Sequence, residues 1–155
     1  MTADVQKYWN EFLILNPAIP KDTPYQAWFF GNTIEMAFEL AELVIEGKKF
    51  ATASLVAVND IKPEEAPIPD GYSVVTDFHG VPMCVIQTVD IRHVPFEDVD
   101  SQFALDEGEG DLSLEYWRGV HWRYFAREAA ELGIDLNKRS FVCCERFRLL
   151  HPDPK

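Results

Sequence analysis

The segment 32–58 constrains the fold most, because it places a helix directly before a buried strand. Asn32 is the expected N-cap, with Glu35 three positions later. Gly47 is the expected left-handed residue that ends the helix. The run 50–58 is apolar and partly β-branched, which predicts a buried strand. The apolar face of the helix is predicted to comprise Ile34, Ala37, Phe38, Ala41, Val44 and Ile45.

Further helices and strands follow along the chain. The hydrophobic periodicity predicts helices at 5–15, at 98–105, and from a Ser113 N-cap to Gly133. Strands are predicted at 72–76, 83–94 and 141–150, and the first two are joined by a turn at 77–80. Several strands with a few helices predict a single α+β domain over residues 1–155, built as a strongly bent mixed sheet or a small β-barrel.

The charge balance narrows the choice of partners. The 26 acidic residues outnumber the 14 basic ones and give a net charge of −12, which repels polyanions. Tight binding to long nucleic acid or duplex DNA is not expected, although a local basic patch is able to hold short RNA. Three cysteines without regular spacing favour a reducing cytoplasm. No apolar run long enough for export or membrane insertion is present, and no oligomeric state is indicated.

The stretch EGKKFATAS, at 46–54, has two interpretations. In the structural one, Gly47 ends the helix, Lys48 and Lys49 solvate the turn, and Thr52 reflects β-propensity. In the functional one, Lys49 and the Thr52 hydroxyl face one pocket. A partly desolvated lysine whose pKa is lowered to about 7–8 acts as a base and activates a hydroxyl nucleophile.

The acidic segment 106–111 is predicted to be a loop, with four carboxylates and two glycines in six positions. It suits a solvated turn. It also suits a functional site, because crowded like charges raise the pKa of at least one carboxyl and make it a general acid. In that interpretation the glycines let the backbone approach a ligand closely. Both interpretations stay open from the local sequence.

Several other side chains are candidates for binding. Trp28, Phe29 and Phe30 are typical of a core, but an exposed member would form a stacking platform for a base. Arg118 is interpreted either as a surface charge or as a partner of the acidic loop. His121 is predicted to be a core histidine with satisfied hydrogen bonds. No metal-ligand spacing and no phosphate-binding glycine motif is present, so neither a metal nor another cofactor is expected.

Taken in order, these segments resemble the ASCH domain family of the PUA-like superfamily. The resemblance is carried by Phe30-Gly31 before the helix, by Gly-x-Lys-x-x-Thr at 47–52, by EGEGDLSLEYWR with His121, and by the last strand at 142–147. It implies a PUA-like β-barrel with flanking helices and a cleft at the Gly-x-Lys-x-x-Thr motif. RNA binding is the general role proposed for the family.

The resemblance also implies candidate activities. Some small bacterial members are amidohydrolases that remove the acyl group of N4-acetylcytidine with the lysine and threonine of this motif and a later glutamate, and at least one member is a metal-dependent ribonuclease. Transferred by position, the catalytic residues are Lys49, Thr52 and Glu109, with Glu107 as the alternative glutamate. Ser54 stands where members with the longer motif Gly-x-Lys-x-x-Thr-x-Arg carry arginine. Candidate substrate-binding residues are Trp28, Phe30, Glu107 and Arg118.

Three functions follow as hypotheses. The first is an amidohydrolase for a small N-acylated cytidine-type nucleoside, with Lys49 as base, Thr52 as nucleophile and Glu109 as proton donor. The second is an RNA-binding module or ribonuclease that takes short single-stranded RNA. The third is a ligand sensor that uses the same cleft without catalysis.

Overall fold

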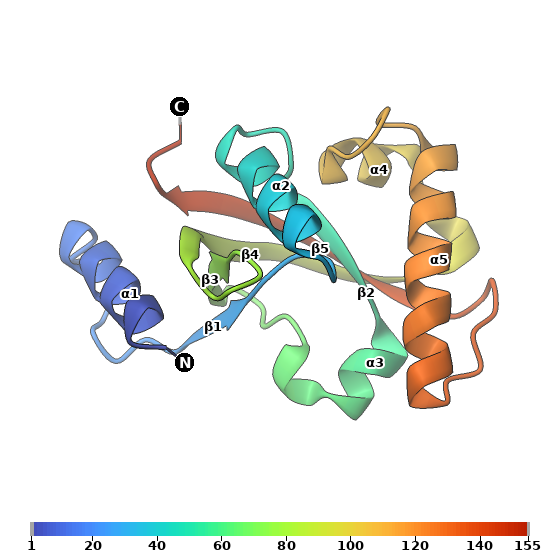
Figure 1. Ribbon diagram of the computed structural model, residues 1–155, viewed down its shortest axis with the longest axis horizontal. Coiled ribbons are helices and arrows are strands. Elements are labelled where there is room, and N and C mark those ends of the chain that lie inside the picture. Colours follow the sequence, from blue (N-terminus) through green and yellow to red (C-terminus); the bar gives the residue numbers. More distant parts are fainter. Residues whose placement is uncertain (1, 155) are drawn as a thin grey trace.

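The computed structural model describes residues 2–154 and contains one five-stranded sheet with helices around it (Figure 1). The strands are β1 (Tyr25–Trp28), β2 (Ala51–Leu55), β3 (Tyr72–Thr76), β4 (Pro82–Pro95) and β5 (Phe141–His151). The α-helices are α1 (Ala3–Leu15), α2 (Ile34–Ile45), α3 (Val56–Ile61), α4 (Ser101–Glu107) and α5 (Leu114–Leu132). Two short 3₁₀ helices are η1 (Pro63–Glu65) and η2 (Phe96–Asp98).

The sheet is mixed and bent, with strand order β1-β3-β4-β5-β2. β1 runs parallel to β3, whereas the other pairs are antiparallel. The long strands β4 and β5 pair with register shifts at Val85/Ile86 and Thr88/Asp90, and such bulges bend a strand. Within residues 2–154 the edge strands β1 and β2 do not pair with each other, so the sheet stays open. The predicted bent sheet is confirmed.

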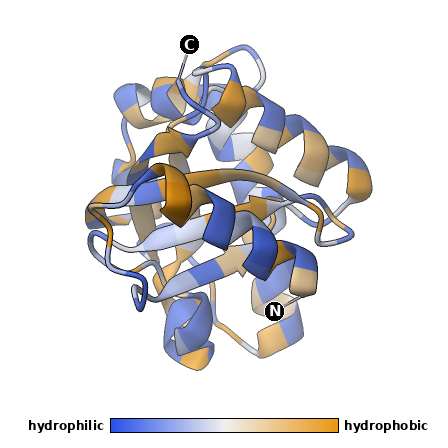
Figure 2. Ribbon diagram, turned by 90° about the vertical axis from the view of Figure 1, so that its left-hand side faces the viewer, coloured by the Kyte–Doolittle hydropathy of each residue, from blue (hydrophilic) through white to orange (hydrophobic). Residues whose placement is uncertain are grey.

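The helices cover the sheet through one apolar face each. In Figure 1, α1 lies at one end of the molecule and α5 at the other. Phe12 of α1 packs with Val74 and Val85, and Phe125 of α5 packs in a second cluster with Leu55. Figure 2 shows hydrophilic and hydrophobic residues alternating along the helices, as expected when only one face is buried.

Most predicted elements are confirmed, including the hairpin of β3 and β4 and the Ser113 N-cap, whose hydroxyl accepts from the Tyr116 N–H at 3.0 Å. The predicted N-cap of α2 is wrong by one residue. The hydroxyl of Thr33, not Asn32, accepts the hydrogen bond of the Met36 N–H at 3.1 Å. Gly47 has φ of 79°, as the helix end requires.

Two boundaries and one strand differ from the prediction. The run 50–58 splits into β2 and α3, because a short apolar run does not distinguish a strand from a buried helical turn. β1 was missed, since its four residues gain their pairing only from the distant β3. Glu107 belongs to the end of α4, where Gly108 is the left-handed C-cap, and not to the acidic loop.

Candidate functional site

Lys49 is placed by the turn that ends α2. The carbonyl of Leu43 accepts from the backbone N–H groups of Lys48 and Lys49, at 2.9 and 3.1 Å. The next N–H, of Phe50, donates to the carbonyl of Asp106 at 2.9 Å and ties this turn to α4. The Lys49 side chain is directed into the protein and is 1% exposed.

The Lys49 ammonium is fully engaged. Its Nζ donates to Glu107 Oε1 at 3.0 Å, to Glu109 Oε2 at 2.7 Å and to the Ala51 carbonyl at 2.8 Å. Burial by itself lowers the pKa of Lys49, but the charges and hydrogen bonds of the two glutamates outweigh it and raise that pKa. The expected lowering to about 7–8 is therefore wrong, because Lys49 is held as an ammonium ion and is not a resting base.

Glu107 is surrounded by hydrogen-bond donors. Its Oε2 accepts from the indole N–H of Trp117 and lies 3.1 Å from Nε2 of His121. Nδ1 of His121 lies 2.8 Å from the Trp117 carbonyl, which only accepts, so Nδ1 carries a proton. With Nε2 facing a carboxylate, the ring is an imidazolium ion. Burial raises the pKa of Glu107, but Lys49 and His121 outweigh it and hold that pKa below the usual range.

Glu109 differs from Glu107 in its surroundings. Its side chain is 16% exposed against 2% for Glu107, and Lys49 is its one side-chain partner within residues 2–154. Burial raises the pKa of Glu109, the Glu107 charge raises it further, and the opposing effect of Lys49 does not cancel these. The prediction that one carboxyl of this segment has a raised pKa is confirmed, with burial as the main cause.

The glycines of the acidic loop serve packing inside the protein. A Cβ at Gly108 would lie 2.1 Å from the carbonyl oxygen of Lys48, and one at Gly110 would lie 2.3 Å from the Tyr116 ring. The expected close approach to a ligand is replaced by a close approach to the protein itself. Gly108 thereby holds the loop against the turn that carries Lys49.

Glu107, Glu109 and His121 form a group of potential metal ligands that their spacing did not predict. Their ligand atoms lie within 4.8 Å of one another. The Lys49 ammonium already bonds to both carboxylates and takes the position that a cation would need. Trp117 and His121 are one turn apart in α5, with rings stacked at 4.2 Å. This spacing was the sequence signal that both face one partner.

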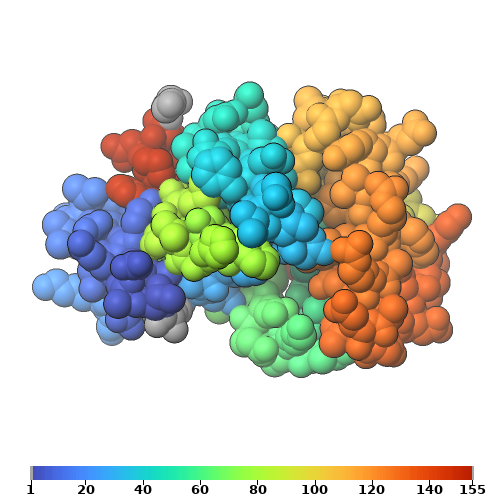
Figure 3. All heavy atoms as spheres, viewed as in Figure 1, coloured from blue at the N-terminus to red at the C-terminus, as the bar shows by residue number. Residues whose placement is uncertain are grey.

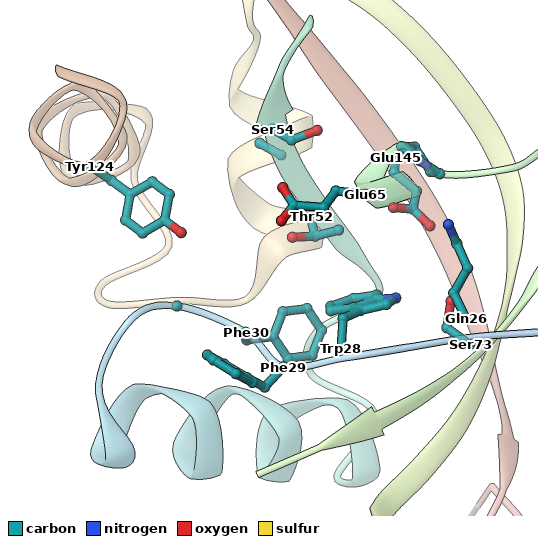
Figure 4. Close-up of a pocket in the computed structure, with 13 residues that line it drawn as sticks. Gln26, Trp28, Phe29, Phe30, Thr52, Ser54, Glu65, Ser73, Tyr124 and Glu145 are labelled. Atoms are coloured by element: carbon teal, nitrogen blue, oxygen red, sulfur yellow. The ribbon is translucent and has the colours of Figure 1, made fainter. Parts of the chain in front are cut away.

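Two adjoining hollows form the cleft, and Thr52 lines both. The first contains the charged cluster, namely Lys49, Glu107, Glu109 and His121. The second lies between the open edges of the sheet, with side chains from β1, β2, β3 and β5 around it (Figure 4). Figure 3 shows light blue, green and orange segments meeting near the centre of this face. Segments of these colours supply most residues of the second hollow, and Glu145 comes from β5, near the red end of the chain. The residues that line both hollows are Phe30, Gly31, Thr52, Ala53 and Tyr124.

The aromatic run before α2 is only partly core. Phe30 is 4% exposed and lies edge-on to Trp28 at 4.8 Å between ring centroids, whereas Phe29 is 39% exposed. Trp28 and Phe30 both line the cleft, and their role in binding stays a prediction. Of the two interpretations of Arg118, the structure fits the surface charge and not the partner of the acidic loop. Arg118 is exposed, donates to the Glu97 carbonyl at 3.2 Å, and is not among the residues that line the two hollows.

The imidazolium of His121 predicts a pH-dependent contribution to stability. Burial lowers the pKa of His121, but Glu107 outweighs it and raises that pKa above its unfolded value of about 6.5. The contribution is therefore complete below about pH 6.5 and is lost as the pH rises through the folded-state pKa. We expect His121→Phe to cost about 1.5–3 kcal/mol at pH 6 and less at pH 9, measured by denaturant unfolding. An equal loss at both pH values would contradict the charged state, and His79→Phe in an exposed turn is the control.

Comparison with known proteins identifies the family. A family model described as an ASCH domain matches residues 26–151. The crystal structure of an ASCH domain from Lactobacillus crispatus JV V101 is 28% identical, with a TM-score of 0.86 over 97% of this chain and 96% of that chain. The structure of a protein from Enterococcus faecalis V583 is also 28% identical, with a TM-score of 0.85 over 97% and 92% of the two chains.

Two further observations are negative. No match is found among curated proteins. Within residues 2–154, each helix is too short or too polar to cross a membrane.

The family model spans most of the chain, including the Gly-x-Lys-x-x-Thr turn and the acidic loop, and the two structures share the fold over almost their whole length. The chain therefore belongs to the ASCH domain family and has its PUA-like fold.

Proposed function

We propose that this protein is an amidohydrolase that cleaves the acyl amide of a small N-acylated cytidine-type nucleoside. The observation that carries the proposal is the cleft in which Thr52 adjoins a buried pair, the Lys49 ammonium and the Glu109 carboxyl at 2.7 Å. A hydroxyl nucleophile, a fixed positive charge and a carboxyl with a raised pKa are the groups that amide cleavage uses.

Each group takes a role that fits its protonation state. Thr52 Oγ1 attacks the acyl carbon. The positive charge of Lys49, whose hydrogens stay bonded to acceptors of the protein, stabilises the oxyanion that forms through its field and without a direct hydrogen bond. This role replaces the predicted role of Lys49 as base. Glu109 is preferred to Glu107 as the proton donor to the leaving amine, because Glu109 has the raised pKa and is open to the cleft. Water then hydrolyses the acyl ester of Thr52.

The charges around the cleft favour a nucleoside over RNA. Among the residues that line the two hollows, Lys49 and His121 are the cations, and both lie against carboxylates. Glu65 and Glu145 add negative charge to the second hollow. The negative charges of the cleft would repel a polyanion. They would take little binding free energy from an uncharged nucleoside, whose base is able to stack on Trp28.

Hydrolysis of N4-acetylcytidine, followed by absorbance, tests this function. We expect the wild type to turn over the nucleoside, Thr52→Ala to lose turnover, and Thr52→Ser, which keeps a hydroxyl, to retain part of it. Glu109→Gln should be about 10²-fold slower or more, because it cannot donate the proton. Absence of turnover by the wild type at high enzyme concentration, or full activity of Thr52→Ala, would refute the proposal.

A further inference from the structure

Glu145 is a neighbour of Thr52 across the sheet, and the mechanism above does not use it. In the pairing of β2 with β5, Thr52 lies directly opposite Glu145. Opposed residues of an antiparallel pair project from the same face, with Cβ atoms about 4.5–5.5 Å apart. Figure 4 shows both side chains in the same pocket. A carboxylate thus stands beside the proposed nucleophile.

One oxygen of Glu145 is anchored and the other is open. The residue is 6% exposed, and its Oε2 accepts from the Thr88 hydroxyl at 2.6 Å. Within residues 2–154, Thr88 is the one side-chain partner of this carboxylate. No enclosed side-chain polar atom of the described chain lacks a hydrogen bond, so the second oxygen of Glu145 is accessible. Glu145 lines the second hollow, and this hollow is where we place that oxygen. The side chain is a fixed acceptor with one free oxygen.

The other titratable groups of the cluster are committed elsewhere. The Lys49 ammonium donates to four acceptors, namely the Ala51 and Glu107 carbonyls and the Glu107 and Glu109 carboxylates. Glu107 is bonded to Lys49, Trp117 and His121. Glu109 is the proposed proton donor. Burial raises the pKa of Glu145, while Thr88 and Lys49 lower it by less. A carboxylate with a pKa moved towards neutrality is a better proton acceptor than an ordinary one.

We infer that Glu145 is the general base that takes the hydroxyl proton of Thr52. This inference rests on the proposed function. As Thr52 Oγ1 bonds to the acyl carbon, its proton passes to the free oxygen of Glu145. The C–N bond then breaks, and Glu109 gives its proton to the leaving nitrogen.

The second half of the reaction restores every group. Water adds to the acyl ester of Thr52 and gives one proton to Glu109. The ester C–O bond breaks, Glu145 returns its proton to Thr52 Oγ1, and the carboxylic acid leaves. The net change is one amide and one water converted into one amine and one acid.

Acetylation of Thr52 by p-nitrophenyl acetate tests the base without the nucleoside. The rate is measured as the p-nitrophenolate burst, and the modified residue is identified by peptide mass spectrometry. We expect acetylation of Thr52 in the wild type to accelerate with rising pH and then level off. Glu145→Gln keeps the size and the acceptor for Thr88, and it should be about 10²-fold slower or more. Glu128→Gln is the matched control, since burial also raises the pKa of Glu128 but it lies outside the two hollows.

A second variant distinguishes the loss of a general base from a loss of folding. Thr88→Val removes the hydrogen bond that favours the charged form of Glu145, so the midpoint of the pH profile should move to higher pH. Unmodified Thr52 in the wild type, or an unchanged rate and pH profile in Glu145→Gln, would overturn the inference. Slow Thr52 acetylation in Glu145→Gln together with no turnover of N4-acetylcytidine by the wild type would support the base and refute the nucleoside substrate.

Discussion

Replacing Lys49 with methionine should lower the free energy of unfolding by about 3–5 kcal/mol, because it removes one partner of a buried ion pair. Methionine fills a similar volume, so the loss is mainly electrostatic. Glu107, with a side chain 2% exposed, would lose the ammonium at 3.0 Å and keep its charge in the interior. The measurement is denaturant unfolding at pH 7, with the slope checked for two-state behaviour.

Lys48 provides the matched control one position earlier. Its side chain is 66% exposed and pairs with Glu46 at 3.0 Å on the surface. Lys48→Met should therefore change the stability by about 0–1 kcal/mol. Equal effects at the two positions would show that the cluster around Lys49 contributes no more than a surface pair.

The loss of unfolding free energy in Lys49→Met should become smaller as the pH falls. In the wild type the pKa of Glu107 is lowered below its unfolded value, so its contribution is present above about pH 4.3 and is lost as the pH falls through the folded pKa. Without Lys49, the ionised Glu107 stabilises the fold less at neutral pH. In acid below the folded pKa, Glu107 is protonated in both proteins, so the substitution removes little stability there. The difference in the free energy of unfolding between wild type and variant should decrease as the pH falls below about 4. A difference that does not change with pH would contradict an electrostatic origin.

Local chemistry predicted the ends of the helices well, but the charge states in the cleft depend on distant contacts. Gly47 and Ser113 take the roles that their residue types favour. The direction of the Lys49 pKa was predicted wrongly, because its partner Glu107 is 58 positions away and nothing local indicates a contact at 3.0 Å. The resemblance to the family placed the lysine and the glutamate at the cleft without their protonation states.

Strand register was a second property of the site that the sequence alone did not predict. In the sequence, Glu145 is one polar residue of the final strand, and only the pairing of β2 with β5 sets it opposite Thr52. The same limit applies to β1, whose parallel pairing with β3 positions Trp28 at the cleft. Arg118 is the opposite case: it is close in sequence to the acidic loop, but its side chain donates to the Glu97 carbonyl instead.

Gly108→Ala should be the second large loss of stability, of about 2–5 kcal/mol, from two causes. A left-handed backbone costs a non-glycine residue about 1–2 kcal/mol, and φ at Gly108 is 71°. The new Cβ would also lie 2.1 Å from the Lys48 carbonyl oxygen, and overpacking of this kind adds about 1–3 kcal/mol. Because the obstacle is backbone, relief requires the Lys49 turn and the Glu109 loop to separate.

Gly133→Ala distinguishes the two causes. Gly133 has φ of 70° at the end of α5, almost the same conformation as Gly108, but a Cβ there meets nothing within 4 Å. It should cost only the conformational part, about 1–2 kcal/mol. The additional loss of unfolding free energy in Gly108→Ala, compared with Gly133→Ala, then measures how tightly the acidic loop is held against the Lys49 turn. Equal losses at both glycines would mean that the loop moves away at no cost, and that Glu109 is not held at a fixed distance from Lys49.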